Sequence, residues 1–122
     1  MDADFKLDKK RQFRFTQSSG RAFEQAYGDS LLNALNKMGP NVTNFMTWAA
    51  VRHLFQNKLT HEHTDVLIQK FIDKGGDAQD LIKFLCDGWT KSGVIGRPDE
   101  EAASLEVLEA EVEADPESGP KD

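Results

Sequence analysis

The sequence predicts an α+β fold that is mainly α-helical, with a short N-terminal β-hairpin packed on a compact set of about five short helices. Three observations support it: apolar and polar residues alternate near the N-terminus, later stretches have apolar residues at helical spacing, and glycines separate those stretches. The length of 122 residues allows one domain. We place that domain at residues 1–98 and an acidic, largely disordered tail at residues 99–122.

The hairpin is predicted from large apolar residues that alternate with polar ones. Phe5 and Leu7 form one such pair, and Phe13 and Phe15 form the other, so each pair lies on one face of a strand. The polar residues 8–11 supply the turn. Because two strands alone are marginally stable in water, we expect helices to cover the apolar face.

The helices are predicted from capping residues and from the glycines that end them. We expect the first helix to be capped within Thr16–Ser19 and ended by Gly28, and the second to be capped by Asp29 or Ser30 and ended by Gly39–Pro40. The third helix should begin at Thr43 or Asn44. The fourth should be capped by Thr60 and ended by Gly75–Gly76, and the fifth capped by Asp77 and ended by Gly93.

The apolar faces of these helices predict the core. A small domain needs such a core because it buries a smaller fraction of its surface than a large one. The residues that we expect to be buried together are Phe23, Leu35, Trp48, Phe71, Leu85 and Trp89. Other members of the predicted faces include Ala22, Ala26, Tyr27, Leu31, Leu32, Met38, Phe45, Ala49, Val51, Arg52, Phe55, Val66, Leu67, Lys70, Leu81, Ile82 and Cys86.

Charge is distributed unevenly along the chain. Residues 99–122 carry ten acidic side chains and one lysine, a net charge of −9, whereas residues 1–98 carry 14 basic and 11 acidic side chains, a net charge of +3. The charge of the domain is too small to predict nucleic-acid binding, which needs a clustered basic face.

The acidic tail has two interpretations. High charge without aromatic residues favours a disordered, solubilising segment. However, Leu105, Leu108 and Val112 follow helical spacing, so the tail could instead form a helix on a partner. The solubilising interpretation is the favoured one.

The remaining composition indicates a protein of the reducing cytoplasm that does not enter a membrane. Cys86 is the only cysteine, so no disulfide can form within the chain. The charged N-terminal residues lack the apolar stretch of a signal peptide. The longest apolar-rich run, residues 45–51, is too short to cross a bilayer.

One motif resembles a reactive site, but helix capping explains it better. Residues 28–31 spell the GDSL signature of a family of serine hydrolases, yet no Asp-x-x-His follows to activate the serine. We interpret this motif as the end of one helix and the cap of the next.

A histidine-rich stretch resembles a metal site, but its spacing does not suit one. His61 and His63 lie two residues apart and point to different sides of a helix, while Glu62 and Asp65 fit an exposed first turn. We expect no catalytic residue, no metal, no cofactor and no enzymatic activity.

Partner binding is therefore the expected chemistry. Lys9, Lys10, Arg11 and Arg14 form a basic patch that either keeps the hairpin turn hydrated or docks an acidic partner, including the tail itself. Trp48 and Trp89 fit the core better, but tryptophan is also a common interface anchor. The candidate partner-binding residues are Lys9, Lys10, Arg11, Trp48, Trp89, Leu105, Leu108 and Val112.

The order of these elements resembles a known family. The relevant segments are Phe5-Lys6-Leu7, Lys9-Lys10-Arg11, Phe13-Arg14-Phe15, the helix end Phe23–Gly28, and the later stretch Leu59–Gly93. Over residues 4–95 the chain resembles tail assembly chaperones of long-tailed bacteriophages and gene transfer agents. The resemblance lies in element order and apolar positions and includes no catalytic motif.

The resemblance implies a function. Such chaperones coat the long, helical tape measure protein before tail tube subunits polymerise around it, and they are absent from the finished virion. It implies binding to the tape measure protein and possibly to the tail tube protein, self-association, and a location in the host cytoplasm, without nucleic-acid or membrane partners. The alternative is a small adaptor or inhibitor domain that binds one folded protein with fixed stoichiometry.

Overall fold

The computed structural model describes residues 1–95, which form a two-stranded antiparallel hairpin and five α-helices. The elements are β1 (Asp2–Lys6), β2 (Lys10–Arg14), α1 (Gln17–Tyr27), α2 (Leu31–Leu35), α3 (Pro40–Val51), the 3-10 helix η1 (Arg52–Phe55), α4 (His61–Asp73) and α5 (Ala78–Ser92). The predicted mainly helical α+β fold with an N-terminal hairpin is confirmed. Within residues 1–95, no helix has the length and apolar character needed to span a membrane.

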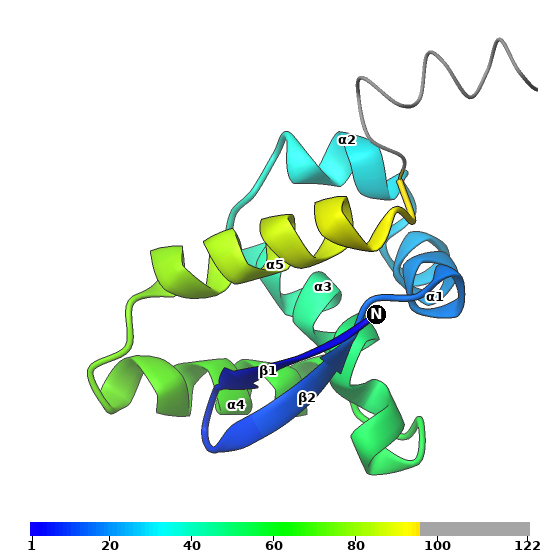
Figure 1. The fold of residues 1–122 in the computed structure, drawn as a ribbon. Coiled ribbons are helices and arrows are strands. Elements are labelled where there is room, and N and C mark those ends of the chain that lie inside the picture. The colour runs from blue at the N-terminus through cyan, green and yellow to red at the C-terminus, as the bar shows by residue number, and fades with distance from the viewer. Residues whose placement is uncertain (96–122) are drawn as a thin grey trace, which may run out of the picture.

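Helix α3 lies at the centre of the fold (Figure 1). Helices α1, α4 and α5 and strand β2 all pack against it. Its buried residues therefore occupy most of its circumference rather than one stripe. They are Val42, Thr43, Asn44, Met46, Thr47, Ala49, Ala50 and Val51.

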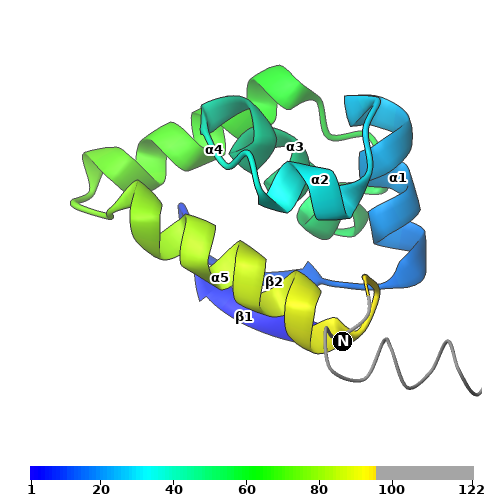
Figure 2. The ribbon, with the colours of Figure 1, turned by 90° about the horizontal axis from the view of Figure 1, so that it is seen from above.

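Helix α5 runs alongside the hairpin in both views (Figures 1 and 2). The ring of Phe84 lies 4.8 Å from that of Phe5 and 5.0 Å from that of Phe13, between centroids. The ring of Phe15 meets Trp89 edge-on at 5.0 Å. Such aromatic pairs add about 0.5–1.5 kcal/mol each beyond the burial of their area. These contacts provide the cover that the isolated hairpin lacks.

The GDSL motif caps two helices, as predicted. Gly28 ends α1 with a φ of 88°, and the hydroxyl of Ser30 accepts a hydrogen bond from the Asn33 N–H at 3.0 Å. The carboxylate of Asp29 accepts from the Ser30 N–H at 2.7 Å. The other confirmed helix ends are the caps Thr16, Thr60 and Asp77 and the terminal Gly93.

Two predicted helix boundaries were wrong. The second helix ends at Leu35 rather than at Gly39–Pro40, and the third begins at Pro40 rather than at Thr43 or Asn44. Proline suits the first position of a helix because its φ is already helical and its missing N–H would have no partner there. Pro40 therefore starts α3 instead of ending α2.

The predicted core is largely confirmed. Phe23, Phe71, Leu85 and Trp89 are buried, whereas Leu35 and Trp48 are half-buried at its edge. Helix α2 has only five residues, so it covers little surface. Four residues that we assigned to inward faces are instead exposed: Ala26, Leu32, Val66 and Lys70.

The core assignment predicts unequal effects of truncating apolar side chains. Phe23 and Trp89 have no exposed surface, so Phe23→Ala and Trp89→Ala should each lower the free energy of unfolding by about 3–5 kcal/mol. Leu32→Ala is the control, since this side chain is 52% exposed and should cost under about 1 kcal/mol. Denaturant melts measure all three, and wild-type stability of both aromatic variants would refute the assignment.

Candidate functional site

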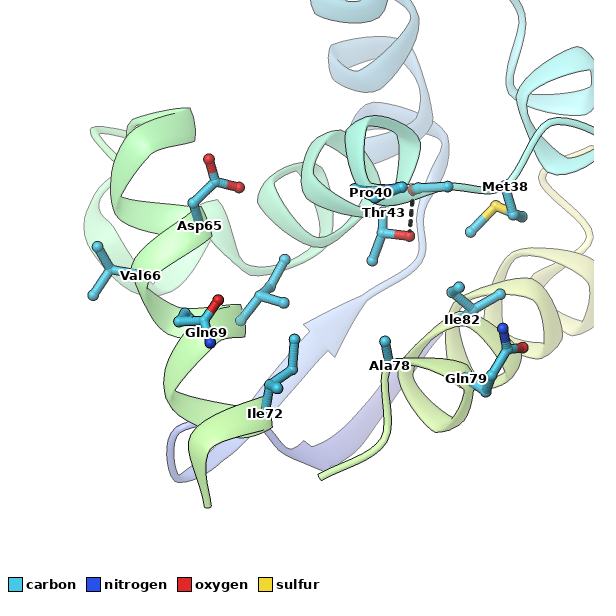
Figure 3. A pocket seen from close by; sticks show the side chains of 12 residues that line it. Met38, Pro40, Thr43, Asp65, Val66, Gln69, Ile72, Ala78, Gln79 and Ile82 are labelled. Carbon is cyan, nitrogen blue, oxygen red and sulfur yellow. Dashed lines mark hydrogen bonds between the residues drawn. The ribbon is translucent and has the colours of Figure 1, made fainter. Parts of the chain in front are cut away.

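A groove with a volume of about 710 Å³ lies between α4 and α5 and is closed at one end by the start of α3 (Figure 3). In the close-up view, Ile72 of α4 faces Ala78 and Ile82 of α5 across the groove. The apolar lining residues are Met38, Pro40, Val66, Ile68, Ile72, Ala78 and Ile82. The remaining lining residues are Gly39, Thr43, Asp65, Gln69 and Gln79.

The groove exists because α4 carries apolar residues on two sides. Leu67 and Phe71 point into the core, whereas Val66 and Ile72 remain 47% and 40% exposed. A helix with one apolar stripe would bury it entirely against the domain. The second set of apolar side chains on α4 therefore remains available to another molecule.

The turn between α4 and α5 depends on two glycines. Gly75 has a φ of 94°, which favours glycine. A Cβ atom on Gly76 would lie 2.4 Å from the Phe71 ring. Since Phe71 is part of the core, it cannot easily move to make room. The two glycines thus fix where α5 begins relative to α4.

A buried asparagine holds α3 and α4 together beside the groove. The Asn44 amide nitrogen donates to the His61 carbonyl at 2.8 Å and to the Asp65 carboxylate at 2.5 Å. Because the side-chain nitrogen of Asn44 is the donor in both of these bonds, its Oδ1 atom accepts a hydrogen bond from His61 Nδ1 at 3.1 Å. Asn44 thereby fixes the first turn of α4 and positions Asp65 at the groove wall.

His61 belongs to an aromatic cluster rather than to an exposed metal-like turn. Its ring stacks on Phe45 at 4.0 Å and lies 4.6 Å from Trp48. Burial lowers the pKa of His61 below its ordinary value, although the charges of Glu62 and Asp65 oppose this shift. Among residues 1–95, no group of three or more His, Cys, Asp or Glu side chains is arranged to hold a metal ion.

The two tryptophans have different environments. Trp89 has no exposed surface, so its interpretation as a partner-binding residue was wrong and its assignment to the core is right. Trp48 is half-buried, and its indole N–H donates to the Leu59 carbonyl at 2.7 Å. The guanidinium of Arg52 covers its outer face at 4.7 Å. Trp48 thus lies at the surface with its one donor already satisfied.

The predicted basic patch is partly neutralised within the hairpin. Arg11 forms a bidentate pair with Asp8, at 2.9 and 2.8 Å, and lies 5.0 Å above the Phe55 ring. This pairing lowers the pKa of Asp8, chiefly through the hydrogen bonds from Arg11. Lys10 lies 3.4 Å from Asp4, and Lys9 is exposed at the turn. Lys9 and Lys10 are therefore the accessible members of the patch.

None of the described partner-binding candidates lines the groove, and Leu105, Leu108 and Val112 lie outside the described residues. Sequence reasoning missed Met38, Ile68 and Ile72 as site residues. One signal was available: α4 has apolar residues at 66, 67, 68, 71 and 72, more than a single helix face can bury.

The groove can bind, but its lining offers little for catalysis. Its floor and walls are mostly apolar, with one carboxylate, that of Asp65, and a few amide and hydroxyl groups. This composition matches an amphipathic helix that inserts apolar side chains at positions i, i+3, i+4 and i+7. The carboxylate favours a ligand with a Lys or Arg beside its apolar face.

Comparisons with models of protein families, with curated proteins and with solved structures found no match to this chain.

Two partly buried histidines, His53 and His61, predict a pH-dependent stability. Burial holds the pKa of His53 and of His61 below 6.5, so the unfolded chain takes up protons at a higher pH than the folded one. Their stabilising contribution is complete above about pH 6.5 and is lost as the pH falls through the folded-state values. The urea midpoint should therefore fall between pH 7.5 and pH 5.5, within the range of about pH 5 to 8 where histidine titrates.

The matched variant is the double substitution His53→Gln/His61→Gln. It should lower stability at every pH but flatten the dependence over this range, because the titrating groups are gone. An unchanged slope in the double variant would show that other groups cause the dependence.

Proposed function

We propose that this protein is a tail assembly chaperone of a long-tailed bacteriophage, and that it binds and solubilises the tape measure protein during tail assembly. The observation that carries the proposal is the apolar groove between α4 and α5, in which Val66 and Ile72 remain exposed. The resemblance in element order supports the same function. Its place of action would be the host cytoplasm, and the mature virion would not contain it.

The groove suits a long helical client better than a compact ligand. A tape measure protein presents successive amphipathic helical turns, each of which can place apolar side chains between α4 and α5. The polar side chains of Gln69 and Gln79 can hydrogen-bond to the flank of such a helix. Many similar sites along one client would bind many copies of this protein.

Other exposed apolar residues support contacts between copies. Leu32 is 52% exposed and Leu54 is 40% exposed, and neither lines the groove. Large exposed apolar groups are a feature of interaction surfaces. Each contact must be weak, because the chaperone must leave when tail tube subunits arrive. We expect self-association in the micromolar range, about −8 kcal/mol.

The second candidate function is an adaptor or inhibitor that binds one folded partner. The half-exposed Trp48 under Arg52 favours it, because tryptophan and arginine are frequent interface anchors. The two functions differ in stoichiometry. A chaperone binds in many copies along its client, whereas an adaptor forms a complex of small, fixed composition.

The proposed function predicts that charge in the groove abolishes client binding. The protein is co-expressed with the long helical protein encoded beside it, and complexes are measured by size-exclusion chromatography with light scattering. The wild type should bind in several copies per client. Val66→Glu/Ile72→Glu should reduce binding at least about tenfold, because each added carboxylate would be desolvated beside Asp65.

The control is Ala26→Glu, which places a carboxylate at an exposed position of α1 outside the groove. It should retain client binding, and circular dichroism confirms that each variant is folded. A one-to-one complex that is insensitive to the groove substitutions would favour the adaptor. Absence of any complex would overturn the chaperone proposal.

A further inference from the structure

A second, polar pocket lies away from the groove, where β2 ends and α1 begins. Its volume is about 320 Å³. Three basic side chains, those of Arg14, Arg52 and His53, line it. Ser18 and Asn57 add polar groups to its wall. This lining is suited to an anion.

Two polar nitrogen atoms of residues that line this pocket lack a partner. Arg52 Nε and His53 Nε2 are buried, and neither has a hydrogen-bond partner within the described part of the chain. Buried polar atoms are nearly always paired, so an unpaired one requires an explanation. A guanidinium nitrogen is always a donor, and an acceptor inside the pocket would satisfy it.

The positive charge around the pocket is poorly compensated. The nearest ion pair joins Arg14 to Asp2 at 3.4 Å, but both side chains are at least 40% exposed, and such pairs contribute little. The N-terminus of α1, whose cap Thr16 lines the pocket, adds partial positive charge, and no acidic residue occupies its first turn.

The chain itself carries the complementary charge. Residues 99–122 hold ten acidic side chains and one lysine. The described part ends at Ile95, which shares a small cavity with Gln17 and Gly20 in the first turns of α1. The four residues from Ile95 to Asp99 can span about 13 Å, which exceeds the width of about 10 Å of a helix. The chain from Asp99 onward is therefore long enough to pass around the end of α1.

We propose that this pocket docks the chain's own acidic segment, residues 99–117, through a carboxylate on Arg52 and Arg14. The competing positions on the molecule are less suitable. At the tip of the hairpin, Arg11 is held by its bidentate pair with Asp8, and Lys9 and Lys10 are exposed side chains without a buried, unpaired nitrogen. In the groove, the carboxylate of Asp65 repels an acidic segment.

Paramagnetic relaxation enhancement on the full chain tests the proposal. Cys86→Ser removes the only cysteine, and Glu109→Cys then places a nitroxide label in the acidic segment. We expect the label to broaden the amide signals of Ser18, His53 and Asn57. High salt should abolish this broadening, because it screens exposed charges.

Charge variants identify the pocket residues. Arg14→Gln/Arg52→Gln should abolish the broadening, whereas Lys58→Gln, an exposed lysine outside the pocket, should leave it unchanged. Broadening confined to Val66 and Ile72 or to Lys9 and Lys10, or none at all, would overturn the proposal. Broadening seen only when labelled and isotope-enriched copies are mixed would assign the segment to a second molecule and equally overturn docking within one chain.

Discussion

The fold depends on the burial of α3 around most of its circumference. A helix in this position contacts neighbours on several sides, so its side chains must be small enough for those neighbours to approach. Ala49, Ala50 and Thr47 satisfy this requirement and are at most 1% exposed. The polar side chain of Thr43 is buried at little cost, because its hydroxyl donates to the Gly39 carbonyl at 2.7 Å. Helices α1, α4 and α5 and strand β2 thus take their positions from one central element.

The same constraint explains the groove. Helices α4 and α5 both pack on α3, and the short turn at Gly75–Gly76 joins them. Phe71, against which Gly76 packs, lies on the inner side of α4, so Val66 and Ile72 must lie elsewhere on that helix. No described element covers these two side chains. Exposed apolar surface of this kind has no stabilising role in the domain, which makes binding its most direct explanation.

Features set by neighbouring residues were predictable from the sequence. The hairpin, the caps Thr60 and Asp77 and the glycines that end α1 and α5 all follow from a few adjacent residues, and the structure confirms them. The surroundings of α3 were not predictable in this way. We assigned Phe45 and Trp48 to the inward face from their helical spacing, but in this central helix the small residues face the neighbours and the large aromatic ones lie at the edge.

The groove could not be predicted for a related reason. Its lining comes from the loop before α3, from α4 and from α5, and no local pattern shows that Met38, Ile72 and Ile82 meet. The polar pocket likewise combines two separate segments, with Arg14 and Thr16 from one and Arg52 from the other. Periodicity identified α4 as amphipathic, but only the packed structure shows which apolar residues remain after the core is complete.

The two sites have opposite electrostatic character, and this separates their ligands. Asp65 lies in the groove wall, whereas Arg14 and Arg52 line the polar pocket. Like charges brought together at a binding surface are unfavourable, so an acidic segment is repelled from the groove and attracted to the pocket. A helical client with basic residues has the reverse preference. The proposed docking of residues 99–117 would therefore leave the groove open to a client and keep the acidic segment from competing for it.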